Sequence, residues 1–142
     1  MKELTPHFAN YYMDIAERTA AMSYATRLKV GSVIVVDNGI VSTGYNGQPK
    51  GHSNECERYD LHLERLVTLD SVIHAEDNAI QRIYERNIRA VGGSIFITHS
   101  PCIKCAKKIL KEGITNVIFK HYYKNDLGID YLSDNHVNVF KL

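Results

Sequence analysis

The sequence lacks any long apolar run and any marked excess of charge of one sign. A membrane-spanning helix needs about 20 mainly apolar residues, and none of the 142 positions begins such a stretch. The start, "MKELTPHFANYY", does not have the pattern of a secretory signal peptide. We therefore expect a soluble, cytoplasmic protein with no membrane partner.

The charge is nearly balanced, with 17 basic and 16 acidic residues and a formal net charge of +1. Domains that bind nucleic acid usually carry a strongly basic surface, so no nucleic-acid partner is expected. A local basic pocket for a small phosphate is still compatible with this composition. Hydrophobic residues make up 44% of the chain, which is enough for a core, and we predict a single domain over residues 1–142.

Cysteine is scarce, and the three present are Cys56, Cys102 and Cys105. Three cysteines cannot all pair within one chain. The last two form a C-x-x-C motif, which in an intracellular protein indicates metal or redox chemistry.

The spacing of apolar residues predicts alternating helices and strands. Residues 7–26 have helical spacing, and strands at 33–36 and 40–45 flank the hairpin signal "DNG". The same patterns predict a helix over 74–88, a strand over 94–98, a helix over 102–112, a strand over 116–120, a short helix over 126–135 and a strand over 137–140. This alternation indicates an α/β fold with helices on both faces of one sheet.

Residues 47–71 are mostly polar and begin with glycine and proline. We predict a long loop here, with a helical turn at 61–68. Loops of this length in a compact domain are usually functional or disordered.

The stretch "VIHAEDNAI" at 72–80 places His74 and Glu76 two positions apart at the start of an apolar helix. Residues two apart in a regular helix point about 200° away from each other. The two side chains can share a site only if His74 lies at the first turn, off the regular spiral, with Ser71 as a candidate cap. Asp77 suits a helix N-terminus and needs no catalytic role.

A second stretch, "PCIKC" at 101–105, begins another predicted helix directly after a strand. Proline is favourable at a helix start, and exposed N–H groups there stabilise thiolates. Because such helix starts gather at one edge of an α/β sheet, Cys102 and Cys105 are expected near His74. These three ligands favour Zn2+ with one position left open for water.

Glu76 fits the chemistry of such a centre. Zinc lowers the pKa of bound water to roughly 7, and a nearby carboxylate can take up that proton and pass it on. H-x-E followed by P-C-x-x-C is the signature of zinc deaminases. Two alternatives stay open: unrelated structural roles for these residues, or a closed zinc site with Cys56 as fourth ligand in a non-catalytic binding module.

Four stretches together resemble the deoxycytidylate (dCMP) deaminase family of the cytidine deaminase superfamily. They are "RLKVGSVIV" at 27–35, "STGYNGQPKG" at 42–51, "HAEDNAI" at 74–80 and "HSPCIKCAKKI" at 99–109. The resemblance covers nearly the whole chain. It implies a three-layer α/β/α sandwich around a five-stranded mixed sheet.

The resemblance also implies a reaction, the hydrolytic deamination of dCMP to dUMP and ammonia. His74, Cys102 and Cys105 would bind the catalytic zinc, and hydroxide on that zinc would attack C4 of the cytosine ring. Glu76 would protonate N3 and then carry a proton to the departing ammonia. The backbone N–H groups of Ala75 and Cys102 would bind the pyrimidine O2 and the attacking hydroxyl.

Recognition of the nucleotide is expected from four further side chains. By resemblance, Asn46 contacts the sugar hydroxyl, although Asn-Gly also forms turns. Arg27 precedes a strand at the edge of the site and suits a 5′-phosphate, although a solvated strand start would look the same. Tyr123 matches a tyrosine common in the family, and His121 beside it is a further candidate substrate contact.

Members of the family are often hexamers that dCTP activates and dTTP inhibits. We expect the same of this chain, with Lys29, Gly44, Tyr45 and Gly47 at the effector site. Lys29 is also a candidate for the substrate phosphate. Basic residues near Tyr123 suggest that dCTP could be a substrate as well as dCMP. Whether His52 and Cys56 help to bind a second zinc is left open.

One rival enzyme is a tRNA adenosine deaminase, which shares "HAE" and "PCxxC" and needs a surface for a large polyanion. A stripe of lysines at helical spacing could serve, or could simply be a solvated helix face: Lys104, Lys107, Lys108 and Lys111. A free-cytidine deaminase is less expected, because that branch typically carries cysteine in place of His74.

Overall fold

The computed structural model describes residues 2–142, which form a five-stranded sheet with helices on both faces. The strand order is β2–β1–β5–β6–β7. The strands are β1 (Gly31–Val36), β2 (Gly39–Tyr45), β5 (Ser94–His99), β6 (Asn116–His121) and β7 (Asn138–Lys141). β1 is antiparallel to both of its neighbours, whereas β5, β6 and β7 are parallel. The predicted mixed sheet is confirmed.

This topology brings several chain segments to one edge of the sheet. Since β1 runs opposite to the other strands, its N-terminal end lies beside the C-terminal ends of β2, β5 and β6. The segments that enter or leave these strands therefore converge. They are residues 27–30, 46–47, 99–102 and 121–124.

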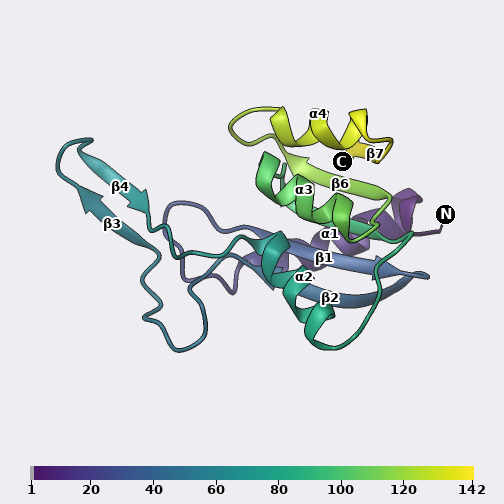
Figure 1. Ribbon diagram of the computed structural model, residues 1–142, viewed down its shortest axis with the longest axis horizontal. Coiled ribbons are helices and arrows are strands. Elements are labelled where there is room, and N and C mark those ends of the chain that lie inside the picture. The colour runs from purple at the N-terminus through teal and green to yellow at the C-terminus, as the bar shows by residue number, and fades with distance from the viewer. Residues whose placement is uncertain (1) are drawn as a thin grey trace.

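The helices form the two outer layers (Figure 1). α1 (Pro6–Ala20) packs on one face, where Val33, Val35 and Phe96 meet its buried side chains. The helices α2 (Ala75–Glu85), α3 (Ile103–Lys111) and α4 (Leu127–Asp134) pack on the other face, against a cluster that includes Ile34 and Ile95. Alternate β1 residues thus enter opposite cores, and the predicted three-layer sandwich is confirmed. A short 3₁₀ helix, η1 (Lys2–Leu4), precedes α1.

Two predicted helix limits need correction. The first helix ends at Ala20 rather than near residue 26, and Met22 is exposed. The chain turns there because the Ser23 hydroxyl donates to the carbonyl of Asn46 and accepts from the Ala25 N–H. In the second helix the cap is His74, in extended conformation, and not Ser71. Between them, the "DNG" turn is confirmed, since Asp37 and Asn38 both have positive φ, as the favoured hairpin turn requires.

The helical turn expected at 61–68 is wrong. That region contains an antiparallel hairpin of β3 (Glu57–Asp60) and β4 (Arg65–Thr68). Its turn forms because Asp60 Oδ1 accepts the N–H groups of His62 and Leu63, at 2.9 Å each.

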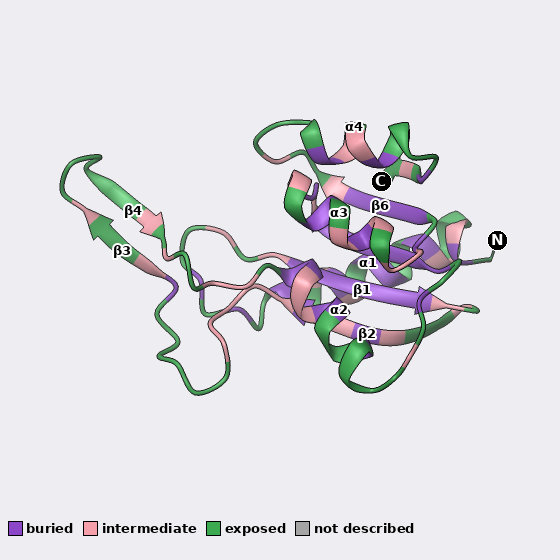
Figure 2. Cartoon of the chain, viewed as in Figure 1, coloured by how far each residue is buried: buried purple, intermediate pink, exposed green. Residues whose placement is uncertain are grey.

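We call residues 48–72 the arm, and it extends away from the body of the molecule (Figure 1). Most of it is exposed (Figure 2), including Tyr59, Leu61 and Leu63. Gly47 and Ile73 are hydrogen-bonded to each other in both directions at the base of the arm, which we call the neck. Among residues 2–142, no helix is long and apolar enough to cross a membrane.

Candidate active site

The first turns of α2 and α3 face the same point at the edge of the sheet. His74 is the N-cap of α2 and Cys102 the N-cap of α3, and both have extended backbones. His74 therefore lies off the helical spiral, as its spacing from Glu76 requires. Cys105 is in the first turn of α3, and its sulfur lies 3.3 Å from His74 Nδ1.

The three ligand candidates fit a zinc ion. The sulfur of Cys102 lies 3.6 Å from His74 Nδ1, and the ligand atoms of His74, Cys102 and Cys105 are all within 4.8 Å of one another. Tetrahedral zinc with ordinary bond lengths separates a nitrogen ligand from a sulfur ligand by roughly 3.6 Å. Within residues 2–142, no other histidine, cysteine or carboxylate cluster of this kind occurs. Cys56 does not belong to the cluster of zinc ligand candidates, because it is buried in the arm and its thiol donates to the carbonyl of Asn54.

The protein environment already favours a thiolate here. Hydrogen bonds from Cys105 and His74 lower the pKa of the Cys102 thiol to about 3. The hydrogen bond to Cys102 raises the pKa of His74, and the pKa of Cys105 is raised because its thiol interacts with Cys102 and is buried. A bound cation would hold both sulfurs as thiolates.

Glu76 is buried beside this cluster, with 4% of its surface exposed. Burial raises the pKa of its carboxyl to about 7, against the opposing effect of His74. A carboxyl group with a pKa near neutrality is well matched to taking up and releasing protons in catalysis.

Buried hydroxyls fix α2 in the position that presents His74 and Glu76. Ser32 donates to the carbonyl of Ala75 at 2.9 Å, and Ser42 donates to that of Ala79 at 2.8 Å. Between them, a Cβ at Gly44 would lie 2.3 Å from the Ala75 oxygen. Only glycine allows β2 to approach the helix so closely.

A second close approach fixes the loop that carries Cys102. A Cβ on Gly128, in α4, would lie 2.1 Å from the carbonyl oxygen of Pro101 and 2.9 Å from the carbonyl carbon of Cys102. The glycine therefore allows α4 to pack directly against the loop that begins α3.

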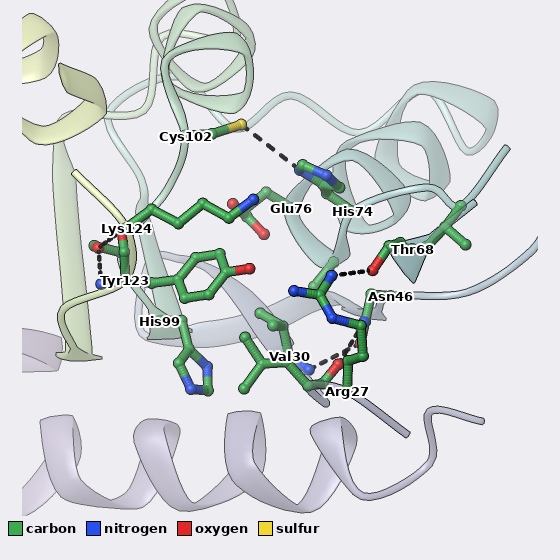
Figure 3. A pocket seen from close by; sticks show the side chains of 14 residues that line it. Arg27, Val30, Asn46, Thr68, His74, Glu76, His99, Cys102, Tyr123 and Lys124 are labelled. Atoms are coloured by element: carbon green, nitrogen blue, oxygen red, sulfur yellow. Dashed lines mark hydrogen bonds between the residues drawn. The ribbon is translucent and has the colours of Figure 1, made fainter. Parts of the chain in front are cut away.

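A pocket opens beside these groups (Figure 3). Its volume is about 160 Å³, far more than the ~10–15 Å³ that one water molecule needs. Glu76 and Ala75 line the wall next to His74 and Cys102, and the lining also includes three predicted substrate contacts: Arg27, Asn46 and Tyr123.

Two of these residues, Asn46 and Tyr123, are held in different ways. Asn46 accepts from the Val30 N–H and donates to the Leu28 carbonyl, both at 2.8 Å, so its amide ties the end of β2 to the start of β1. The second N–H of the Asn46 amide takes part in neither of these two hydrogen bonds. The backbone of Tyr123 is held by Ser100, whose hydroxyl accepts the Tyr123 N–H at 2.8 Å.

The remaining predicted contacts do not line this pocket. His121 is exposed, with its ring 5.2 Å from that of His99. The ammonium of Lys29 donates to the carbonyl of Ser23. Of the other proposed effector residues, Gly44 packs on α2, Gly47 forms the neck, and the carbonyl of Tyr45 accepts from Asn78.

The pocket residues that were not predicted as contacts of dCMP include Thr68, His99 and Lys124. His99 is the last residue of β5, two positions before "PCIKC", so its position was a usable signal. Burial and the nearby His121 lower its pKa. Lys124 was recognised only as a basic neighbour of Tyr123, and it lies over that ring, with its nitrogen 5.2 Å from the centroid. Thr68 belongs to β4, and nothing in the sequence indicates that the arm returns to the pocket.

Two lysines of the stripe on α3 have partners within the protein. Lys108 makes a salt bridge of 2.6 Å with Asp77, and the Lys107 nitrogen lies 5.9 Å from the centroid of the Tyr131 ring. Both lysines therefore have partners within the protein, which weakens the case for a polyanion-binding face.

Comparison with known sequences agrees with this geometry. The sequence model described as the cytidine and deoxycytidylate deaminase zinc-binding region matches residues 6–121. The chain belongs to this family.

Within the family, the chain is similar to several individual proteins. The dCMP deaminase from cyanophage S-TIM5, solved in complex with dCMP and dUMP, is 34% identical, with a TM-score of 0.89 over 98% of this chain and 99% of that one. The deoxycytidylate deaminase of Mycobacterium phage D29 is 32% identical over 80% of this chain and 94% of its own length. ComE operon protein 2 of Bacillus subtilis (strain 168) is 36% identical over 80% of this chain, but the match spans only 59% of that protein.

Proposed function

We propose that the protein is a zinc-dependent deoxycytidylate deaminase that converts dCMP and water to dUMP and ammonia. The observation that carries this proposal is one pocket lined by Glu76 beside the cluster of His74, Cys102 and Cys105. The likeness to the S-TIM5 enzyme, which was solved with dCMP and dUMP, supports the choice of substrate.

In this proposal His74, Cys102 and Cys105 hold the zinc. When bound, the zinc supplies a nucleophile at neutral pH by lowering the pKa of water to about 7. Glu76 accepts the proton of the attacking water and delivers it to N3 of the cytosine ring. It then takes the proton of the hydroxyl formed at C4 and transfers it to the amino group, which departs as ammonia, so that C4 becomes the carbonyl of dUMP. Burial raises the pKa of this carboxyl above its ordinary value, which favours the uptake of a proton as well as its release.

The backbone and the mouth of the pocket orient the nucleotide. Ala75 is the first residue of α2, where an N–H has no acceptor within the helix, and we assign this N–H to the pyrimidine O2. The amide of Asn46 is assigned to the sugar hydroxyl. Arg27 and Lys124 line the same pocket and are assigned to the 5′-phosphate, which suits a guanidinium fork.

Regulation by dCTP and dTTP and assembly into a hexamer belong to the same proposal. Support comes from the arm, which is too long to serve only as a connection between β2 and α2. Turnover of dCTP is part of the proposal as well, and it now rests on Lys124 at the pocket rather than on His121 outside it.

The deciding experiment measures ammonia released from cytidine, dCMP, dCTP and a tRNA hairpin. We expect dCMP to be the best substrate, with dUMP formed in equal amount. Faster release from the tRNA hairpin than from dCMP would overturn the proposal. In the same assay, initial rates are measured against dTTP. A flat response up to millimolar dTTP would remove regulation and leave the catalytic assignment intact.

A further inference from the structure

The hairpin of the arm forms hydrogen bonds with the segment that carries Arg27. Glu57, the first residue of β3, uses both carboxylate oxygens here. They accept the N–H of Thr26 at 3.0 Å, its hydroxyl at 3.1 Å and the N–H of Arg27 at 3.1 Å. Residues 26–30 have no helix or strand of their own, so side-chain hydrogen bonds define the local path of the chain: Glu57 holds residues 26–27, and Asn46 holds Leu28 and Val30.

The other strand of the arm holds the side chain of the same arginine. Thr68, the last residue of β4, accepts a hydrogen bond of 2.7 Å from Arg27 Nη1 (Figure 3). Glu57 and Thr68 are directly opposite each other in the hairpin. One cross-strand pair therefore fixes both the backbone and the guanidinium of Arg27.

This arrangement has a consequence for ligand binding. An exposed arginine side chain loses up to about 2 kcal/mol of rotamer entropy when it is fixed. The hydrogen bond to Thr68 offsets part of that cost before any ligand arrives. It engages only one of the five guanidinium N–H donors. The others are available to an anion at the mouth of the pocket. An isolated two-stranded hairpin is only marginally stable. The hydrogen bonds that Glu57 accepts therefore also help to hold the arm in place.

We infer that Glu57 is a positioning residue: it holds the arm against residues 26–27 so that Thr68 orients Arg27 toward the 5′-phosphate of the substrate. Glu57 thereby favours a nucleoside monophosphate over the nucleoside without touching either one. This inference rests on the proposed function, because it assumes that Arg27 binds the phosphate.

The test compares Glu57→Ala with Glu55→Ala in the full-length, zinc-loaded protein. Glu55 is an exposed residue of the arm whose hydrogen bonds involve only its backbone. Its substitution removes the same charge but leaves the hydrogen bonds between Glu57 and residues 26–27 in place. We expect Glu57→Ala to raise the KM for dCMP roughly tenfold or more, on the scale of hydrogen bonds to charged groups. The kcat for dCMP should stay within about twofold, and Glu55→Ala should match the parent. The kcat/KM for deoxycytidine, which has no phosphate, should not change.

Thr68→Val provides a second variant that leaves Glu57 in place. It should raise the KM for dCMP in the parent protein and have no further effect in an Arg27→Ala background, because the two residues act as one unit. An unchanged KM in Glu57→Ala, or an equal loss with dCMP and deoxycytidine, would overturn the inference. If Arg27→Ala itself leaves the KM for dCMP unchanged, the phosphate assignment in the proposed function is wrong. If Arg27→Ala raises the KM and Glu57→Ala does not, only the inference fails.

Discussion

Glu76 combines burial with a position in the pocket wall, and its substitution isolates proton transfer from binding. Glutamine has nearly the same size as glutamate but cannot carry the proton. We expect Glu76→Gln to lower kcat for dCMP by ~10²–10⁴-fold, the range of general acid–base catalysis. The measurement is ammonia release under saturating dCMP, with zinc content determined on the same sample and expected to be unchanged.

Asp77→Asn is the matched control for that substitution. Asp77 is the next residue of α2, but its carboxylate pairs with Lys108 and does not line the pocket. The Asp77→Asn variant should retain most of the parent's activity. Turnover by Glu76→Gln within about tenfold of the parent would refute the role of Glu76 in acid–base catalysis.

The ligand set makes a separate prediction about metal content. His74→Ala and Cys105→Ala each remove one of three ligands, so we expect both variants to lose zinc on dialysis. Cys56→Ser should keep one zinc per chain, because the Cys56 thiol bonds to Asn54 in the arm. Metal-to-protein ratios measured by elemental analysis decide the matter, and a fully loaded His74→Ala variant would mean that the ligands are misassigned.

At this scale the sequence was informative where function depends on residues close together in the chain. The zinc candidates and Glu76 lie in two short motifs, and each motif begins a helix. Thr68 was not predictable, because its contact with Arg27 joins residues 41 positions apart through a hairpin. His121 was also misplaced: it pairs with His99 across β5 and β6 and its ring lies beside that of His99, but it is exposed, whereas His99 lines the pocket.

Among the elements that carry no proposed zinc ligand, α4 bears on the site because Gly128 lets it contact the loop before α3. We expect Gly128→Ala to destabilise the protein and to reduce its zinc content, because the added Cβ would displace Pro101 and Cys102. Thermal unfolding and metal analysis together test this. Gly39→Ala is the control, since the nearest atom to its added Cβ is 3.5 Å away. A Gly128→Ala variant with parental melting temperature and zinc content would contradict the prediction.

The elements also show where sequence patterns stop being informative. The helices were predicted because their apolar residues recur on one face, and the central strands because they are short apolar runs, which the sheet buries on both faces. The strands of the arm, "ERYD" and "RLVT", have no buried face: Tyr59 and Leu66 are both exposed. Their conformation depends on cross-strand hydrogen bonds and on Asp60 in the turn, which leave little trace in hydrophobic periodicity.

For the whole molecule, zinc should contribute to stability as well as to chemistry. Its proposed ligands come from α2 and α3, which follow different strands of the sheet, so a bound ion would join the two helices. A ligand present at about 1,000 times its Kd stabilises the native state by roughly 4 kcal/mol. We therefore expect a chelator to lower the melting temperature by several degrees or more, and added zinc to restore it.

Cys102→Ser serves as the control for that experiment. It lacks one proposed ligand, so its melting temperature should respond little to chelator or to zinc. Identical melting curves of the parent protein with and without chelator would show that no ion connects the two helices.

The neck has a consequence for how such a protein can change. Since Gly47 and Ile73 pair with each other, the chain leaves the body and returns to it at a single point. The arm between them can therefore be lengthened, shortened or exchanged while the register of β1 with β2 and the position of α2 stay the same. New preferences at the mouth of the pocket can then arise in one stretch of sequence, while the residues assigned to metal and proton chemistry are inherited unaltered.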